Sequence, residues 1–233
     1  MIKKLGTSLV LALFLASVAS AEVLFYDLKW LGIKAGSATL SFYETKDRVK
    51  IVSEARSDPW VDIFYKVRDR VVSLLKKVPP GSISYRITLK EGRHRKDREV
   101  IFYPEPGKVL FKDHLSKEER HIDVPCGLFD PLAGFYVLRN RDLKVGKDEY
   151  IRIFDSKKVY DVRVEVLRKE TVETSLGRFR TIVVKPHMKS EGIFYRKGEI
   201  YIYLTDDERH IPVLLKSKIL IGSVVAELKK IVE

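Results

Sequence analysis

The sequence predicts an all-β protein, mainly antiparallel, folded as a strongly curved sheet or a partly open barrel with one short buried helix. Three observations support this prediction: apolar and polar residues alternate with period two, turn-forming residues separate the alternating segments, and only one segment has a helical pattern. Segments with one apolar and one charged face are typical of antiparallel sheets with one wet side. We therefore expect the apolar faces of successive hairpins to converge on one hollow.

The first 21 residues resemble a secretory leader. Two lysines precede an apolar run from Leu5 to Val18, which ends on Ala19-Ser20-Ala21, the small-x-small pattern that signal peptidase cleaves. The run is too short to span a bilayer comfortably, and no stop-transfer segment follows it. We expect residues 1–21 to be a cleaved signal peptide and residues 22–233 to form a single β-rich exported domain. That domain would be periplasmic and would not span the membrane.

The strands are expected in order along the chain, each with an apolar face. Those faces are Leu24, Tyr26, Leu28 and Trp30; Ala38, Leu40 and Phe42; Val49 and Ile51; Ile83, Tyr85, Ile87 and Leu89; and Tyr160, Val162, Val164 and Val166. Turn signals separate them at Thr45–Asp47, Pro79–Gly81, Glu91–Gly92, Pro104–Gly107, Gly146–Asp148 and Thr205–Glu208.

One segment has the pattern of a helix. Asp130 is a good N-cap, and Pro131 suits the first helical position. Apolar residues from Leu132 to Leu138 cover nearly the whole circumference, which predicts a helix buried in the hollow of the sheet. An outer-membrane barrel is the alternative, but the long charged side chains on the polar faces and the apolar helix count against it.

The charge and the single cysteine set further bounds. The formal net charge of +12 favours anionic partners, and export argues against nucleic acid. The positive charge is densest between Arg86 and Arg98. The candidate contacts for an anionic headgroup are Arg93, Arg95, Lys96 and Arg98, although a solvated hairpin tip is the favoured interpretation. The absence of glutamine, with a single asparagine, is typical of a thermophile, in which part of the charge is thermal adaptation. Cys126 can form no internal disulfide, and its apolar neighbours predict a buried, inert thiol.

The sequence contains no recognisable catalytic motif. It lacks a Gly-x-Ser-x-Gly elbow, a phosphate-binding glycine loop, a dinucleotide fingerprint, a Cys-x-x-Cys pair and histidines at metal-ligand spacing. We therefore expect no cofactor, no metal and no enzyme activity. The less favoured alternative is a carboxylate site assembled by the fold from Asp58, Asp62 or Asp206–Asp207. The acidic run Asp206–Glu208 is interpreted as a hairpin tip rather than a calcium loop.

Aromatic residues are the most suggestive feature of the sequence. The candidates for lining a ligand groove in the concave face are Trp30, Trp60, Phe64, Phe135, Tyr136, Tyr195 and Tyr203. Plain core filling is the favoured alternative for them, because aromatics dominate β cores. We expect a non-enzymatic binder of a lipid-like or amphipathic, anionic envelope component. The alternative is a structural or partner-docking envelope protein, with another envelope protein as its partner.

Several stretches together resemble the exported bacterial family known as domain of unknown function 3108. They are Tyr26-x-x-x-Trp30-Leu31-Gly32-Ile33-x-Ala35-Gly36, the segment from Asp130-Pro131-Leu132 to Leu138-Arg139, Gly177-x-Phe179, Leu204-Thr205-Asp206-Asp207 followed by Ile211-Pro212-Val213, and Gly222-Ser223-Val224-x-Ala226-Glu227-Leu228. Tyr203 departs mildly from the tryptophan that is frequent there. The resemblance implies an envelope location and a β-rich fold, and it supplies no catalytic residues. A likeness to periplasmic lipoprotein carriers is an analogy of fold only.

Overall fold

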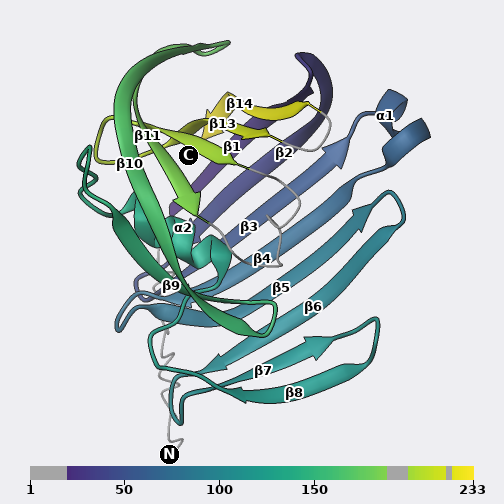
Figure 1. Ribbon diagram of the computed structural model, residues 1–233, viewed down its shortest axis with the longest axis vertical. Coiled ribbons are helices and arrows are strands. Elements are labelled where there is room, and N and C mark those ends of the chain that lie inside the picture. The colour runs from purple at the N-terminus through teal and green to yellow at the C-terminus, as the bar shows by residue number, and fades with distance from the viewer. Residues whose placement is uncertain (1–19, 188–198, 219–221) are drawn as a thin grey trace, which may run out of the picture.

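The computed structural model of the protein describes residues 20–187, 199–218 and 222–233. These residues form one sheet of 14 strands and two short helices (Figure 1). The first eight strands are β1 (Ser20–Trp30), β2 (Ile33–Glu44), β3 (Arg48–Ser57), β4 (Arg68–Lys76), β5 (Gly81–Glu91), β6 (His94–Tyr103), β7 (Lys108–Asp113) and β8 (Glu118–Asp123). The other six are β9 (Glu149–Asp155), β10 (Lys158–Thr174), β11 (Gly177–His187), β12 (Ile200–Thr205), β13 (Pro212–Lys218) and β14 (Ser223–Val232). The helices are α1 (Pro59–Tyr65) and α2 (Pro131–Arg139).

The sheet is a continuous antiparallel meander with two arms, β1 to β8 and β9 to β14, which meet where β1 pairs with β14. The strand order is β8-β7-β6-β5-β4-β3-β2-β1-β14-β13-β12-β11-β10-β9, so β8 and β9 form the two edges of the sheet. Figure 1 shows the sheet curling so that the two arms face each other. The predicted fold class, a strongly curved antiparallel sheet that is not closed, is confirmed.

Helix α2 lies inside the curve and contacts β4 on one arm and β9 on the other (Figure 1). Asp130 caps the helix as predicted, since its side chain accepts hydrogen bonds from the backbone N–H groups of Leu132 and Ala133. The buried hydrophobic side chains form three clusters, and side chains of α2 or of the segment just before it pack against each of them. The position of this helix in the hollow therefore organises the core.

A β-bulge changes one predicted strand face. Leu74 pairs with Ser84 and Leu75 with Ser82, so Ile83 is the extra residue on β5. Beyond the bulge Ser82 is buried in place of Ile83, contrary to the simple alternation expected from the sequence. The bulge has a clear consequence, because it turns the Ser82 hydroxyl toward the buried carboxylate of Asp130.

Helix α1 was not predicted. Asp58-Pro59 repeats the Asp-Pro signal that begins α2, but α1 has no buried residue, and the Asp58 side chain makes no capping hydrogen bond. A periodic apolar face marks a helix that packs against a core, and α1 packs none of its side chains in this way. Within the described parts of the chain, neither helix has the length and apolarity that crossing a bilayer requires.

The prediction of a buried thiol is wrong. Cys126 is exposed in the connection between β8 and α2, where its Sγ–H donates a hydrogen bond to the carbonyl of Pro104 at 3.0 Å. Its apolar neighbours misled the prediction, because Pro125 is also exposed and Val124 is half-buried in this loop.

The exposure of Cys126 predicts rapid chemical labelling. The native protein should react completely with a thiol reagent such as dithionitrobenzoate, without denaturant and in a single phase, since no unfolding is needed to reach the sulfur. The same reaction in denaturant gives the reference rate for a free thiol. Labelling that requires denaturant would contradict the exposed position.

Candidate functional site

The concave side of the sheet forms a partly open apolar cavity of about 310 Å³ against one face of α2. The helix contributes Pro131, Leu132, Gly134, Phe135 and Leu138, and strands of both arms contribute the rest, from Tyr26 on β1 to Ala226 on β14. No charged side chain is among the described residues that line it. An apolar cavity with few polar groups is the usual form of a small-molecule site.

The polar groups of this lining are hydroxyls. They belong to Tyr26, Thr39 and Ser53, on β1, β2 and β3. The Tyr26 hydroxyl donates to the backbone carbonyl of Pro212 at 2.8 Å, and burial raises the pKa of the phenol, so this group stays protonated. The cavity can therefore offer a ligand dispersion contacts and a few neutral hydrogen-bonding groups, but no charge.

Asp130 anchors the helix that forms one wall of the cavity. Its fully buried carboxylate accepts hydrogen bonds from the hydroxyls of Ser73 at 2.7 Å and Ser82 at 2.6 Å. It also accepts bonds from the backbone N–H groups of Leu132 at 3.0 Å and Ala133 at 3.1 Å. Burial raises the pKa of Asp130, against the opposing effect of these donors. The group fixes α2 to β4 and β5, and its acceptor positions are occupied by the protein itself.

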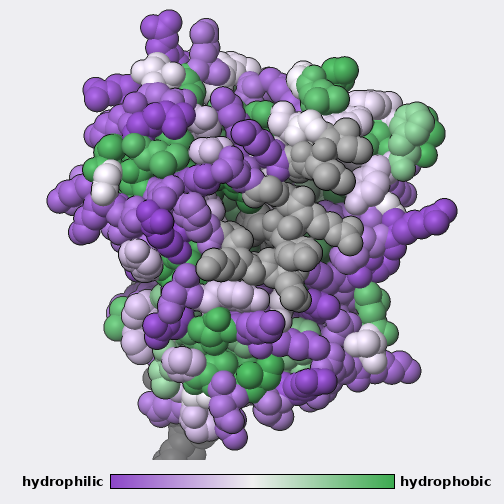
Figure 2. Space-filling view, viewed as in Figure 1, coloured by the Kyte–Doolittle hydropathy of each residue, from purple (hydrophilic) through white to green (hydrophobic). Residues whose placement is uncertain are grey.

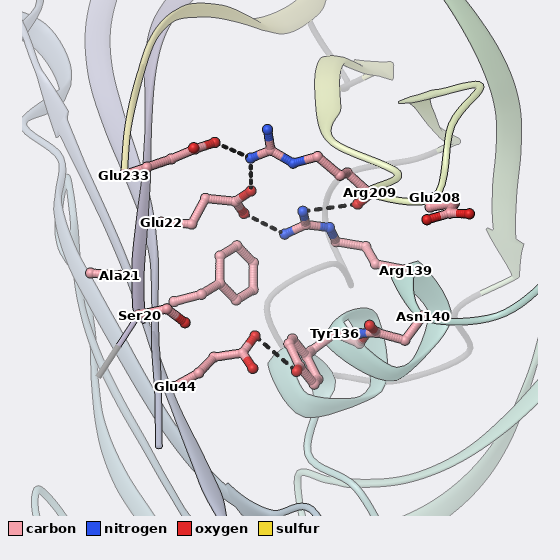
Figure 3. Close-up of a pocket in the computed structure, with 11 residues that line it drawn as sticks. Ser20, Ala21, Glu22, Glu44, Tyr136, Arg139, Asn140, Glu208, Arg209 and Glu233 are labelled. Carbon is pink, nitrogen blue, oxygen red and sulfur yellow. Dashed lines mark hydrogen bonds and ion pairs between the residues drawn. The ribbon is translucent and has the colours of Figure 1, made fainter. Parts of the chain in front are cut away.

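A second, polar cleft of about 570 Å³ lies where α2 faces the beginning of β1 and the turn between β12 and β13 (Figure 3). Arg139 is almost fully buried there, and its guanidinium forms an ion pair with Glu22 at 3.0 Å. The Glu22 carboxylate also forms an ion pair with Arg209 at 2.9 Å. On the same wall Tyr136 donates a hydrogen bond to Glu44 at 2.9 Å. Figure 3 shows these side chains turned toward one another across the cleft, so its charges are largely balanced within the protein.

The structure brings together few of the residues predicted to line a groove. Phe135 lines the apolar cavity, while Tyr136, one residue further along α2, faces the polar cleft. Tyr203 is buried in the core, with the Lys216 ammonium group 5.0 Å from its ring centroid. Tyr195 lies outside the described residues.

Trp30, Trp60 and Phe64 lie away from both cavities. They are exposed at one end of the sheet, because the β1–β2 turn and α1 project beyond the strands that they connect. Most of the strand residues that line the cavity are instead aliphatic, and several of them lie at alternate positions. Val162 and Val164 both line it, and the sequence places them on one apolar face of a strand, so this alternation is the sequence signal for lining residues.

The four predicted headgroup contacts do not line the cavity either. Arg98 is paired with Asp113 at 2.8 Å, and the Arg95 guanidinium donates to backbone carbonyls of its own turn. Lys96 is half-buried, and burial lowers its pKa. Arg93 is exposed in the turn between β5 and β6. Of the four residues it is therefore the one at the hairpin tip, whereas Arg95, Lys96 and Arg98 lie on β6.

Three of the four carboxylates considered for catalysis, Asp62, Asp206 and Asp207, have partners within the protein, whereas the Asp58 side chain makes no capping hydrogen bond. Asp62 is paired with Arg68 at 2.6 Å, and Asp206 with Lys169 at 2.8 Å. Asp207 accepts a hydrogen bond from the Thr205 hydroxyl at 2.7 Å inside the β12–β13 turn, which confirms the predicted hairpin tip. In the part of the chain that the structure describes, no three His, Cys, Asp or Glu side chains come together as metal ligands.

Together these features define a barrel-like β protein: an open, curved antiparallel sheet wrapped around a helix and an apolar cavity. Residues 26–229 match the model of the family described as "Protein of unknown function (DUF3108)", and the chain belongs to this family, which confirms the resemblance noted in its sequence. No curated protein matches the chain.

A solved structure has a similar fold. It is the crystal structure of a "Beta-barrel-like Protein of Domain of Unknown Function DUF1849" from Brucella abortus, with a TM-score of 0.59 and 14% sequence identity. The match covers 91% of this chain and 96% of that chain. At this level of identity the likeness concerns the fold alone, which both chains share over nearly their full lengths.

Proposed function

We propose that this protein is a non-enzymatic binder of a lipid-like or amphipathic component of the cell envelope, acting in the periplasm. The observation that carries the proposal is the cavity of about 310 Å³, which lies between α2 and the two arms of the sheet and has no charged side chain in its described lining. The leader-like sequence of residues 1–21 supports the location.

The apolar lining of the cavity supports a ligand. The cavity opens partly to solvent, so without a ligand its apolar side chains are in contact with water. Removing apolar surface from water is favourable by about 25 cal/mol per Å². A bound apolar chain displaces this water, and its atoms supply contact partners for the lining side chains.

The size and chemistry of the cavity favour a single slender chain. Its volume is at the lower end of the range of roughly 300–1,000 Å³ that small-molecule sites occupy. The uncharged lining accepts an acyl or isoprenoid tail and would reject a charged headgroup, which loses its hydration there without gaining a partner. The headgroup of an amphipathic ligand would therefore remain outside the cavity.

The alternative function, docking of a partner through an exposed sheet edge, has less support. Edge strand β8 is short and presents mostly charged side chains, a common device against strand pairing. At the other edge, the backbone of Phe129 exchanges hydrogen bonds with Arg152 and Phe154 of β9 and covers part of that strand. Both edges are thus protected against addition of a strand.

A cavity-filling substitution tests the proposal. Ala38 on β2 lines the cavity, and Ala38→Phe would place a ring in the space that the ligand requires. We expect the affinity for a fluorescent fatty-acid probe to fall at least about tenfold, while the melting temperature stays the same or rises because the ring fills a void. Binding is measured by titration and stability by thermal unfolding of the same samples.

The matched control adds the same ring outside the cavity. Thr171→Phe changes an exposed position on β10 and should leave probe affinity unchanged. Ala226→Leu is a gentler filling variant on β14, and it keeps the test decisive if Ala38→Phe unfolds the protein. Probe binding that survives both filling variants would overturn the proposal. So would a protein that yields no lipid by mass spectrometry after purification from its own envelope.

A further inference from the structure

Exposed apolar side chains gather at one end of the sheet and form a surface that we call the rim patch. It comprises Trp30, Leu31 and Ile33 of the β1–β2 turn and Trp60, Ile63, Phe64 and Tyr65 of α1. Figure 1 places the tip of the β1–β2 hairpin and α1 at the same end of the molecule, and Figure 2 shows apolar side chains at both of these places. An exposed apolar surface of this kind usually marks a site of interaction.

The rim patch is held together by backbone contacts, so its members have fixed positions. The Trp60 indole N–H donates to the carbonyl of Lys34 at 3.1 Å, and the N–H of Asp58 donates to the carbonyl of Ala35 at 2.8 Å. These bonds attach α1 to the beginning of β2. The helix nevertheless buries none of its residues: Ile63 is 78% exposed and Phe64 is 82% exposed. A fixed element that presents its largest apolar side chains to solvent is suited to contact another surface.

The turn between β5 and β6 adjoins the patch and brings positive charge to it. The N–H of Gly92 donates to the carbonyl of Lys66 at 2.9 Å, and the ring of Tyr65 packs against the open side of this glycine. A Cβ atom at Gly92 would lie only 2.6 Å from that ring, so the contact requires glycine. Arg93 therefore lies next to Lys66 and α1, and both cations are exposed.

One acidic group of α1 is already neutralised within the protein. Asp62 is paired with Arg68 at 2.6 Å, and hydrogen bonds from Arg68 and Ser57 lower the pKa of its carboxyl. Lys66 and Arg93 have no ion-pair partner among the residues that the structure describes. The rim patch is thus apolar and aromatic at its centre and has unpaired positive charge on one side.

We propose that the rim patch docks the protein on the surface of an anionic lipid bilayer. Tryptophan and tyrosine favour the headgroup level of a membrane, and exposed aliphatic and phenyl side chains enter the boundary beneath it. Lys66 and Arg93 are placed to meet lipid phosphates, which attract basic residues next to an inserted apolar group. This inference goes beyond the proposed function, because none of the patch residues lines the apolar cavity.

Intrinsic fluorescence can test the inference directly. The chain has two tryptophans, and both belong to the rim patch. Vesicles that contain phosphatidylglycerol should shift the tryptophan emission to shorter wavelength, and the protein should pellet with these vesicles on centrifugation. Added salt should weaken both effects. Vesicles of phosphatidylcholine alone should bind at least about fivefold more weakly, because they lack the net negative charge.

Matched substitutions distinguish binding through the rim patch from nonspecific adsorption to vesicles. Phe64→Ser should reduce binding to anionic vesicles at least about fivefold. Val78→Ser should leave it unchanged, since Val78 is 77% exposed but lies in the β4–β5 turn at the opposite end of the strands. All of these variants change exposed side chains, so the fold is expected to survive them.

Charge reversal supplies an independent test. Reversing both Lys66 and Arg93 to glutamate should weaken binding at least about tenfold. The same reversal of Lys46 and Lys76, two exposed lysines at the opposite end of the strands, should have a much smaller effect.

Three results would overturn the inference. The first is an unchanged tryptophan emission with anionic vesicles, and the second is an equal loss of vesicle binding in the rim-patch and control variants. The third is a photo-crosslinker at position 64 that captures one protein while the vesicles bind none of this chain. The cavity is assayed separately, with a soluble probe and the Ala38→Phe variant. Failure of one proposal is therefore distinguishable from failure of the other.

Discussion

Replacing Asp130 with alanine is expected to destabilise the protein by about 3–5 kcal/mol, one of the largest effects available to a single substitution. The fully buried carboxylate holds the hydroxyls of Ser73 and Ser82 and two backbone N–H groups at the start of α2. Alanine would leave these four donors without their acceptor and remove the helix cap at the same time. Urea unfolding followed by circular dichroism measures the loss.

The second Asp-Pro pair of the chain provides the control for this experiment. Asp58 precedes α1 as Asp130 precedes α2, but its side chain makes no capping hydrogen bond. We expect Asp58→Ala to cost less than about 0.5 kcal/mol, in the range of ordinary surface substitutions. Equal losses for the two variants would show that the hydrogen bonds of Asp130 are not the source of its effect.

The pH dependence of the Asp130 effect follows from the direction of its pKa shift. Burial raises the pKa of Asp130 above its ordinary value of 3.8, so the folded state holds the proton more tightly than the unfolded state does. The contribution of this group to stability is therefore complete below pH 3.8 and declines as the pH rises through the folded-state pKa. The stability of the wild type relative to Asp130→Asn should fall with rising pH in this interval, because asparagine does not titrate. A constant difference would contradict the shift.

The alternation of apolar residues predicted the fold because it is a local property of each strand. Val162 and Val164 point inward on β10 as their spacing indicated, and Asp130-Pro131 began the helix that fills the hollow. Both features depend on residues close in sequence, and side-chain direction along a strand follows directly from its pleat. Most strand neighbours are local as well, since short turns place successive antiparallel strands side by side. The pairing of β1 with β14 is the exception, because it joins distant parts of the chain.

The candidate site was harder to predict because it depends on contacts between distant segments. Ser82 faces Asp130 only because a bulge shifts the register at Ile83, and no local pattern indicates that bulge. Aromatic residues were expected in the cavity, but aliphatic side chains line most of it. Trp60 lies outside the cavity, where its indole N–H donates a hydrogen bond to the backbone carbonyl of Lys34 at the beginning of β2. Whether an apolar side chain points into a hollow or out at a rim is decided by the tertiary structure.

Replacing Arg139 with alanine is expected to cost about 3–5 kcal/mol and to lower the melting temperature by roughly 8–15 °C. Its buried guanidinium pairs with Glu22 at 3.0 Å, donates to the backbone carbonyls of Arg209 and His210 at 3.1 Å each, and lies 4.6 Å from the ring centroid of Phe42. Without it, two carbonyls lose their donor and the Glu22 carboxylate loses its buried partner, keeping only the exposed Arg209. Thermal unfolding of the purified variant measures the loss.

Arg141, two residues further along, is the matched control for this prediction. It also pairs with a glutamate, Glu149 at 2.7 Å, but about a third of its side chain is exposed, so Arg141→Ala should cost less than about 1 kcal/mol. Arg139→Lys should recover only part of the stability, because an ammonium group keeps the charge but cannot reach three acceptors in one plane. If lysine restored full stability, the charge alone would matter. If the two alanine variants were equally stable, the polar cleft would contribute nothing to fixing α2 against β1.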